Sequence, residues 1–487
     1  MSIVNPILHF GRCRPQDDAL VEDGRVLSYA ALAALLGRTA SHLRDLGIGK
    51  GDRVGIRMFD SADHLVALLA LAQARAVAVP LDWRAPPAEC ERLIDGLGLK
   101  AVLAEAGARP IRAVPAIPVD DDWRRAVAKA DPACDPGGQW SDPFLISATS
   151  GSTGRPKFTL MTHAQYCFAT VGMWELMGLT GRHRFLSTLA LVYSGGRNSC
   201  LAHLLRGDAV VLHSGFFVSG QYVETVRRHR ITTAAIVPSM ARQMLADAQD
   251  GPLLPGLAAL FCSGAPLHPE EKRRALRLLT SGFHERYGTA ETLGISVLRP
   301  ADFADRALSV GLPHSLAEVQ VVGEADDVLA AGAEGRLRLR APGMGAPLPG
   351  SESQASFRDG WFYPGEIARL DEAGYIFLLG RTSDVIMRSG TKIYPAEVED
   401  VLTGHRGVVD AAVIGRSGPD GEEEATAFVV LRGGVEVGEI VAHCRAGLAP
   451  HKVPRHFRQL AELPRNAAGK VDRAALAARA DDPSSSN

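Results

Sequence analysis

The chain has 487 residues, of which 46% are hydrophobic, and its 53 basic and 55 acidic residues nearly cancel. That length is enough to bury a large core and to form two or three structural units. The balanced charge excludes the strong field that draws a protein to nucleic acid or to an anionic membrane surface, so we expect no nucleic-acid partner.

We predict a cytoplasmic protein from the cysteine usage and from the lack of a signal-peptide pattern in the first residues. The seven cysteines are scattered without a CxxC pair, which indicates reduced thiols. The first residues lack the basic start and long apolar run of a signal peptide. The most apolar stretch, residues 65–81, is interrupted by Gln73 and Arg75 and is too short to cross a bilayer, so we expect no integral membrane association.

The first third of the chain alternates helical and strand patterns. Ser28 is placed to cap a helix whose leucines recur at three- and four-residue spacing, and the strand "RVGIRM" follows. Further short apolar runs, from "AVAVPLD" to "ALFCSGA", are separated by helix-length segments. This β/α alternation predicts an α/β fold of layered sheets flanked by helices.

The last part of the chain changes character. The short strands "GEIARLD" and "GYIFLLG" are expected first, and after "GRTSDVIMRSG" a helix starts near Pro395, followed by strands "DAAVIG" and "ATAFVVL". We therefore predict a large domain over residues 1–380 and a small, mobile α+β domain over residues 381–487. The tail "DDPSSSN" is expected to be disordered.

One stretch, "TSGSTGRPK", suggests a phosphate-binding loop. Its glycines permit tight turns, its amides and hydroxyls can face an anion, and Lys157 would neutralise charge. The loop residues are Thr149, Ser150, Gly151, Ser152, Thr153 and Gly154. A Walker loop does not fit, because Pro156 and Phe158 stand where that motif needs glycine and a hydroxyl. From these residues alone, a flexible surface loop remains the alternative.

Further motifs follow in a fixed order. They are "ALFCSGAPL", "ERYGTAET", "GWFYPGEIARLDEAGYIFLLGR", "GRTSDVIMRSGTKIYPAEVEDVL" and "LPRNAAGKVDR". Together with "TSGSTGRPK" they resemble the adenylate-forming superfamily, which includes the acyl- and aryl-CoA ligases, over nearly the whole chain. Each motif is weak to moderate alone, but their conjunction in this order is specific.

The resemblance implies an ATP site and assigns its residues. Tyr287 would stack on or flank adenine, Glu291 would hold Mg²⁺ against the phosphates, Glu366 would accept the ribose hydroxyls, and Arg381 would contact ribose and phosphate. The remaining nucleotide contacts implied are Ser263, Gly264, Ala265, Gly288 and Thr289. Taken without its neighbours, Glu291 would be expected to be a solvated loop acid.

The resemblance implies two half-reactions: formation of an acyl-adenylate from an acid and ATP, and attack of the coenzyme A thiol on that adenylate. The small domain is expected to contribute to both. Lys470 would enter the active site during adenylation and join Glu291 and Lys157 as a catalytic residue. Gly390 would let the backbone approach the pantetheine arm of coenzyme A. ATP, Mg²⁺ and coenzyme A are thus the expected cofactors, and a small carboxylic acid is the expected substrate.

The acid pocket is expected beside "LVYSGGRNS". The resemblance places Tyr193, Gly195, Gly196, Val237 and Gly294 around the acid. Members that activate amino acids carry an aspartate here that this chain lacks, so a free α-amino acid is not expected. Arg197 could pair with a second carboxylate or polar substituent of the substrate, although a helix-start or surface arginine with no substrate role is the simpler expectation.

Four residues depart from the family pattern: Phe158, Ala290, Glu366 and Ser383. They concern, in turn, the stiffness of the phosphate loop, one donor to the α-phosphate, the placement of the ribose, and the hinge. The leading prediction is an ATP-dependent acid–CoA ligase acting through an acyl-adenylate. The alternatives are an enzyme that loads an acyl carrier protein and a non-catalytic nucleotide-binding relative.

Overall fold

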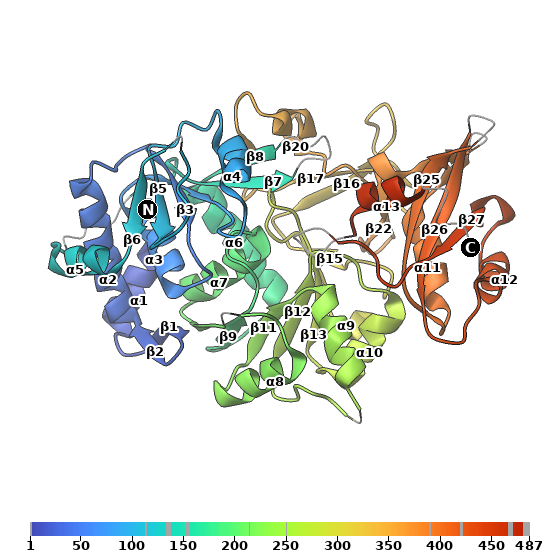
Figure 1. The fold of residues 1–487 in the computed structure, drawn as a ribbon, viewed down its shortest axis with the longest axis horizontal. Coiled ribbons are helices and arrows are strands. Elements are labelled where there is room, and N and C mark those ends of the chain that lie inside the picture. The colour runs from blue at the N-terminus through green and yellow to red at the C-terminus, as the bar shows by residue number, and fades with distance from the viewer. Residues whose placement is uncertain are drawn as a thin grey trace.

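The computed structural model describes residues 2–112, 114–132, 138–150, 156–213, 215–249, 251–388, 391–418, 422–465 and 471–480. Figure 1 shows layered sheets and helices in the larger part of the molecule and a smaller unit, coloured orange to red, at one end. The predicted mixed α/β architecture, with a large N-terminal domain and a small C-terminal one, is confirmed.

A seven-stranded sheet is built mainly from the first part of the chain, in the order β18-β8-β7-β4-β3-β5-β6. Its strands are β3 (Arg53–Arg57), β4 (Val77–Pro80), β5 (Ala101–Glu105), β6 (Ala116–Val119), β7 (Pro143–Ser150), β8 (Pro156–Thr162) and β18 (Ala346–Pro347). β7 and β8 pair antiparallel with Thr149 opposite Lys157, so the two strands flank the glycine-rich stretch.

Helices α1 (Asn5–Cys13), α2 (Tyr29–Asp45), α3 (Ala62–Gln73), α4 (Pro87–Ile94) and α5 (Asp121–Lys129) accompany this sheet. The Ser28 side chain accepts the Ala31 N–H at 3.2 Å and caps α2, as predicted. The apolar stretch over residues 65–81 forms α3 and β4, and α3 lies in the largest hydrophobic core. Among the described residues, no helix has the length and apolarity needed to span a bilayer.

A nine-stranded sheet follows, in the order β15-β14-β13-β12-β11-β9-β10-β1-β2. Its strands are β1 (Asp18–Glu22), β2 (Arg25–Ser28), β9 (Arg184–Ser187), β10 (Ala209–Leu212), β11 (Thr233–Ile236), β12 (Ala259–Ser263), β13 (Phe283–Tyr287), β14 (Ser296–Leu298) and β15 (Leu312–Pro313). Its helices are α6 (His163–Met177), α7 (Ser194–Arg206), α8 (Ser219–Arg228), α9 (Pro238–Asp247), α10 (Pro269–Leu278) and η1 (Pro300–Asp302). β11, β12 and β13 are parallel, so their carboxyl ends share one edge.

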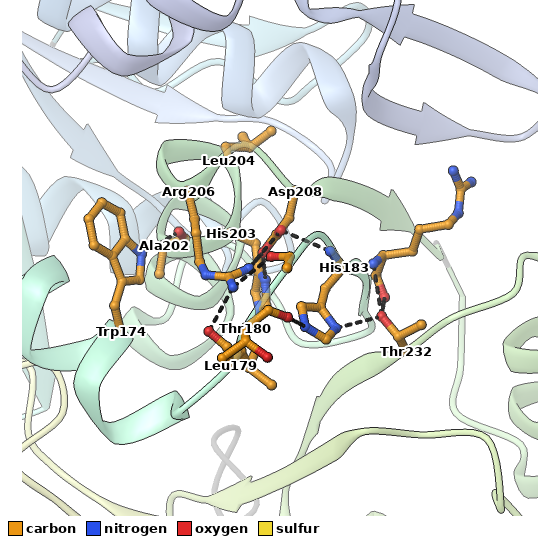
Figure 2. A network of polar contacts seen from close by, with 12 residues as sticks. Trp174, Leu179, Thr180, His183, Ala202, His203, Leu204, Arg206, Asp208 and Thr232 are labelled. Atoms are coloured by element: carbon orange, nitrogen blue, oxygen red, sulfur yellow. Dashed lines mark hydrogen bonds and ion pairs between the residues drawn. The ribbon is translucent and has the colours of Figure 1, made fainter. Parts of the chain in front are cut away.

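A buried polar network fixes the C-terminal end of α7, as Figure 2 shows. The carboxylate of Asp208 accepts two hydrogen bonds from Arg206, at 2.8 and 2.9 Å, and one from the backbone N–H of His183 at 2.9 Å. His203 contacts the same carboxylate at 2.8 Å. Because Asp208 is fully enclosed by cationic and N–H partners, this end of α7 is held rigidly and its N-terminal end is placed accordingly.

A third sheet has the order β19-β20-β17-β21-β22, with β16 paired to β17. Its strands are β16 (Glu318–Val322), β17 (Gly335–Arg340), β19 (Phe357–Arg358), β20 (Trp361–Phe362), β21 (Glu366–Leu370) and β22 (Ile376–Arg381). Two short helical turns, η2 (Glu352–Ser356) and η3 (Thr382–Asp384), adjoin it. β21 and β22 fall within the two short strands predicted from the sequence, apart from the last residue of β22.

The C-terminal unit has two small sheets and its own hydrophobic core. It contains β23 (Ile386–Arg388), β24 (Thr391–Ile393), α11 (Pro395–Gly404), β25 (Val408–Ser417), β26 (Glu423–Leu431), α12 (Val437–Gly447), η4 (Pro450–Lys452), β27 (His456–Gln459) and α13 (Arg473–Ala480). The helix predicted from Pro395 is confirmed. His268 of the large domain contacts Asp400 of α11 at 2.9 Å, so the two units touch.

Candidate active site

Lys157 lies in β8, directly after the glycine-rich stretch. Its ammonium group donates a hydrogen bond to the Ser356 hydroxyl at 3.3 Å, which ties β8 to η2. Residues 151–155, which include Gly151, Ser152, Thr153 and Gly154, lie outside the described residues, as do Gly390 and Lys470. Thr149 and Ser150 form the last residues of β7. The described flanks thus form a hairpin with one lysine at its base.

Phe158, a departure from the family pattern, is a core residue. Its side chain is 8% exposed and belongs to a hydrophobic cluster that includes Ile146 and Leu348. Its backbone N–H donates to the Ser353 hydroxyl at 3.1 Å, and its carbonyl accepts from the same hydroxyl at 2.6 Å. The backbone of Phe158 therefore joins the strand that carries Lys157 to η2, which carries Ser353 and Ser356, while its ring packs in the core.

The predicted adenine wall lies at the shared edge of the parallel strands. Ser263 ends β12, Tyr287 ends the neighbouring β13, and Val237 follows β11. Gly264 has φ of +104°, a conformation that side-chain-bearing residues rarely adopt, and a Cβ there would lie 3.7 Å from Val237. Ala265 is half-buried beside it. Gly264, which is predicted to lie beside the adenine base, and Val237, which is predicted to contact the substrate acid, are thus neighbours.

Tyr287 and Glu366 are brought together from different sheets. The Tyr287 hydroxyl donates a short hydrogen bond to the Glu366 carboxylate. Burial, followed by the neighbouring Glu366 charge, raises the pKa of Tyr287 well above its ordinary value, so the hydroxyl keeps its proton. Arg381 is the cross-strand partner of Glu366 in the β21–β22 ladder. Three residues assigned to one nucleotide therefore lie within one region.

The segment predicted to act as a hinge begins at this point. Ser383 donates from its hydroxyl to Asp384 at 2.8 Å, and Asp384 forms an ion pair with Arg473 of the C-terminal unit at 3.2 Å. A cavity of about 250 Å³ opens beside Glu366 and Thr382. The family's common acidic or basic hinge residue is absent at Ser383, but the next residue supplies a charge that contacts the small domain.

Glu291 is a buried acid, 8% exposed, which overturns the alternative of a solvated loop carboxylate. The turn around it is held by hydroxyls: Thr289 accepts the Glu291 N–H at 3.2 Å, and Thr292 accepts the Thr289 N–H at 3.1 Å. Gly288 has no room for a side chain, since a Cβ would lie 2.0 Å from the Leu293 carbonyl oxygen. The turn is thus rigid around one carboxylate.

The Glu291 carboxylate fits a Mg²⁺ ligand. Among the described residues it forms no hydrogen bond or ion pair, although a buried charge requires a partner. No group of three or more His, Cys, Asp or Glu capable of holding a metal occurs in the described part of the chain. A hard cation here would therefore take one carboxylate and complete its shell with phosphate oxygens and water.

Ala290 stands where the family usually has a threonine that donates to the α-phosphate. Two nearby hydroxyls, those of Thr289 and Thr292, could supply this donor instead. Thr292 is 3% exposed, and its hydroxyl already lies 3.2 Å from that of Thr289. Thr289 is half-buried and lies nearer the surface. Of the two, Thr289 is the better placed to reach a ligand, although its hydroxyl already accepts the Glu291 N–H.

Three of the residues predicted to contact the substrate acid, Tyr193, Gly195 and Gly196, lie at the N-terminal end of α7. The Tyr193 hydroxyl donates to Asp82 at 3.4 Å, and burial raises its pKa. A Cβ on Gly195 would meet open space, whereas one on Gly196 would lie 2.5 Å from the carbonyl oxygens of Leu189 and Ala190. Gly195 thus leaves free volume, and Gly196 allows the preceding loop to approach the helix closely.

Two findings alter the predicted acid pocket. Gly294 faces α6, since a Cβ there would lie 2.6 Å from the Met173 sulfur. Arg197 lies at the start of α7, as the helix-start alternative predicted, and because it is 1% exposed the surface alternative is excluded. Its guanidinium donates to the carbonyls of Leu191 and Val192 at 3.1 and 2.7 Å and to Ser147 at 2.8 Å, so protein acceptors already occupy it.

Sequence reasoning missed three residues of this region. Ser356 contacts Lys157, Asp82 contacts Tyr193, and Arg286 lies buried immediately before Tyr287. The first two come from segments far away in the sequence and carry no motif. Arg286 did carry a signal, because it stands within the motif "ERYGTAET", directly before Tyr287.

Comparison with known proteins agrees with this geometry. The family model "AMP-binding enzyme" matches residues 9–346, and "AMP-binding enzyme C-terminal domain" matches residues 397–470. A feruloyl-CoA synthase of Amycolatopsis sp. is 33% identical, with 94% of this chain and 95% of that protein covered. A 2-succinylbenzoate–CoA ligase of Bacillus subtilis is 28% identical, with 96% of each covered.

Solved structures give the same result. The o-succinylbenzoate CoA synthetase of Bacillus subtilis, in complex with its acyl-adenylate intermediate, has a TM-score of 0.88 at 25% identity and covers 99% of each chain. The same enzyme with ATP and magnesium ion has a TM-score of 0.87 at 26% identity, with 98% of this chain and 99% of that chain covered. The chain therefore belongs to the AMP-binding enzyme family of the adenylate-forming superfamily.

Proposed function

We propose that this enzyme is an ATP-dependent carboxylic acid–CoA ligase that acts through an acyl-adenylate. Family membership over both domains supports an AMP-forming acid–thiol ligase. The observation that carries the proposal is the contact of Tyr287 with Glu366, because it joins the two motifs assigned to adenine and ribose around one nucleotide.

In the first half-reaction, a carboxylate oxygen attacks the α-phosphorus of ATP, the bond to the bridging oxygen breaks, and pyrophosphate leaves. Negative charge grows on the α-phosphoryl oxygens, so fixed positive charge and N–H donors there lower the barrier. Lys157 and Lys470 are assigned to that charge, and Glu291 is assigned to Mg²⁺. The metal would neutralise phosphate charge and orient the polyphosphate.

In the second half-reaction, the thiol sulfur of coenzyme A attacks the carbonyl carbon of the adenylate and AMP leaves with its electron pair. Lys470 must withdraw to make room for the pantetheine arm. A domain movement near Arg381 would exchange Lys470 for the segment that carries Gly390. We place the domain boundary at residues 380 and 381, directly before η3, for this reason.

A carrier protein is the second candidate acceptor of the acyl group. A fatty acid–[acyl-carrier-protein] ligase of Streptomyces coeruleorubidus is 29% identical over 95% of this chain and 93% of that protein. The named CoA ligases are similar over equal lengths, so we favour free coenzyme A. Because the reaction consumes ATP and coenzyme A, we propose that the enzyme acts in the cytoplasm.

Two assays test this proposal. First, carboxylic acids are screened for ATP–pyrophosphate exchange, beginning with aromatic acids because the relatives include feruloyl-CoA, indoleacetate and 2-succinylbenzoate enzymes. Second, the active acid is supplied with coenzyme A or with a phosphopantetheinylated carrier protein, and the thioester is detected by mass spectrometry. Exchange followed by acyl-CoA supports the proposal, and acyl transfer to the carrier alone refutes the CoA assignment. Absence of exchange with every acid contradicts the ligase itself.

A further inference from the structure

Arg286 is a buried cation without an anionic partner. Its side chain lies in β13 and the residue is 7% exposed. Its guanidinium donates to the Ser199 hydroxyl at 3.2 Å, contacts the Met173 sulfur at 3.9 Å and lies 5.1 Å from the centre of the Phe261 ring. No described carboxylate forms an ion pair with it. Five N–H donors therefore face a single oxygen acceptor among the described residues.

Other buried cations of the same domain have more acceptors: Arg57 and Arg197 also form no ion pair with a described carboxylate, but each donates to three oxygen atoms. On the opposite face of β13, the buried Lys272 pairs with Glu285 at 2.5 Å, and at the end of α7 Arg206 pairs with Asp208. Burial lowers the pKa of Arg286 to about 10, and the only opposing charge effect comes from the Cys262 thiol. A buried charge with neither a counterion nor a full set of acceptors is costly, and a ligand that supplies a counterion would remove that cost.

Arg286 points toward α6 and α7, and the predicted acid pocket lies at the N-terminal end of α7. Neighbouring residues of a strand point to opposite faces, so Tyr287 faces Glu366 while Arg286 faces α6 and α7. The Ser199 hydroxyl donates to the carbonyl of Gly195 at 2.7 Å, and Gly195 lies one turn closer to the N-terminal end of α7. An acid bound beside Gly195 and extending along α7, away from the phosphates, would therefore approach Ser199 and Arg286.

We propose that Arg286, with Ser199 beside it, closes the far end of the acid pocket, and that the substrate acid carries a second anionic group at the end away from the activated carboxylate. A carboxylate is the best match, because the planar guanidinium can donate two parallel hydrogen bonds to it. Arg197 is not the residue concerned, since protein acceptors already occupy its guanidinium. The inference rests on the proposed ligase function.

The first test measures ATP–pyrophosphate exchange of the wild-type enzyme with matched acids that differ only in a distal carboxylate: hexanoate with adipate, and phenylpropanoate with its para-carboxy derivative. The diacid of at least one pair is expected to give the higher kcat/KM. If no acid supports exchange, the ligase proposal itself fails. If the monoacids react at least as well as the diacids, the ligase stands and the role of Arg286 is overturned.

The second test changes Arg286. Arg286→Met is expected to reduce the diacid-to-monoacid ratio of kcat/KM at least about tenfold, the usual effect of losing a charge-assisted hydrogen bond, and Arg286→Lys is expected to retain part of the preference. Arg340→Gln is the matched control, because Arg340 is an exposed arginine that pairs with Glu318 at 2.6 Å on the third sheet. An equal loss for both acids in Arg286→Met would contradict the inference.

A stability measurement separates recognition from structural support. Since Arg286→Met removes an uncompensated buried charge, the ligand-free variant is expected to keep or increase its Tm. The diacid is expected to raise the Tm of the wild type and to leave that of the variant unchanged. A large decrease in the Tm of the ligand-free variant would show that Arg286 supports the fold, and would overturn the proposal.

Discussion

Tyr287 donates a hydrogen bond to Glu366, a residue 79 positions further along the chain and in a different sheet. The contact joins the end of β13 to the start of β21, and Arg381 lies opposite Glu366 on β22. A nucleotide bound here would therefore meet groups from two sheets that the fold already holds together. If Glu366 binds the ribose as the resemblance implies, its carboxylate, longer than the family's aspartate, would still have a fixed donor in Tyr287.

Tyr287→Phe removes the hydroxyl and keeps the ring. Glu366 then loses its donor, and we expect the KM for ATP to rise about tenfold, equivalent to ~1.4 kcal/mol, with a smaller change in kcat. Steady-state exchange at varied ATP measures this effect. Tyr222→Phe is the control, since the buried Tyr222 hydroxyl has no hydrogen-bond partner among the described residues. An unchanged KM for ATP would separate the contact from nucleotide binding.

Glu291→Gln replaces the carboxylate that is assigned to Mg²⁺. An amide is a weaker ligand for a hard cation, so exchange should fall about 100-fold and require more Mg²⁺ for half-maximal rate. A Mg²⁺ titration at fixed ATP gives both quantities. Glu318→Gln, at an exposed carboxylate of β16, serves for comparison. A variant with the wild-type Mg²⁺ dependence would remove Glu291 from the metal site.

Lys470→Ala tests the domain movement. We expect adenylate formation to decrease far more than thioester formation from a supplied acyl-adenylate, because Lys470 is assigned to the first half-reaction alone. The two half-reactions are measured separately, by pyrophosphate release and by acyl-CoA formation. Equal losses in both would count against the exchange of Lys470 for the segment around Gly390.

Stability should decrease in mild acid. Burial lowers the pKa of both His64 and His163 to about 4 from an ordinary value of 6.5. The unfolded chain therefore binds protons that the folded chain excludes as the pH falls from 6.5 toward 4. The free energy of unfolding should fall by about 1.4 kcal/mol per pH unit for each histidine in this range. Stability above pH 7 is unaffected by these groups.

Urea unfolding at pH 7.5, 6 and 5 measures this slope. His64→Gln should reduce the slope of the unfolding free energy against pH by about 1.4 kcal/mol per pH unit, the contribution of one histidine, since glutamine does not titrate. His163 stacks on Phe144 at a centroid distance of 5.1 Å and is harder to replace without a packing defect, so His64 is the better site. A free energy of unfolding that is constant over this range would refute the assignment of these two groups.

Local signals in the sequence were sufficient for many elements. Ser28 caps α2, and the helix from Pro395 forms as predicted, because capping and apolar spacing depend on residues close in sequence. Ser263 and Tyr287 were predicted by motif, and parallel pairing of β12 with β13 places both at one sheet edge. Motif order therefore predicted which residues approach one another.

The burial of individual side chains, and the residues that they contact, could not be predicted from local sequence patterns. Arg197 was expected at a helix start or at the surface, because arginines are usually exposed, yet at the start of α7 it is enclosed by carbonyls of the preceding loop and by Ser147 of β7. Glu291 looked like a loop acid when taken alone, and Phe158 was expected only to stiffen a loop. For Arg197 and Phe158 the contacts with Ser147 and Ser353 come from segments distant in sequence, which periodicity and spacing do not report.

The account depends most on attack of the acid on the α-phosphorus of ATP. The direct measurement uses an acid labelled with oxygen-18 in its reacting carboxylate, together with ATP, Mg²⁺ and coenzyme A, and analyses the nucleotide product by mass spectrometry. The account predicts AMP that carries one labelled oxygen, with pyrophosphate and the acyl-CoA thioester as the other products. Unlabelled AMP, or release of ADP and phosphate, would contradict it.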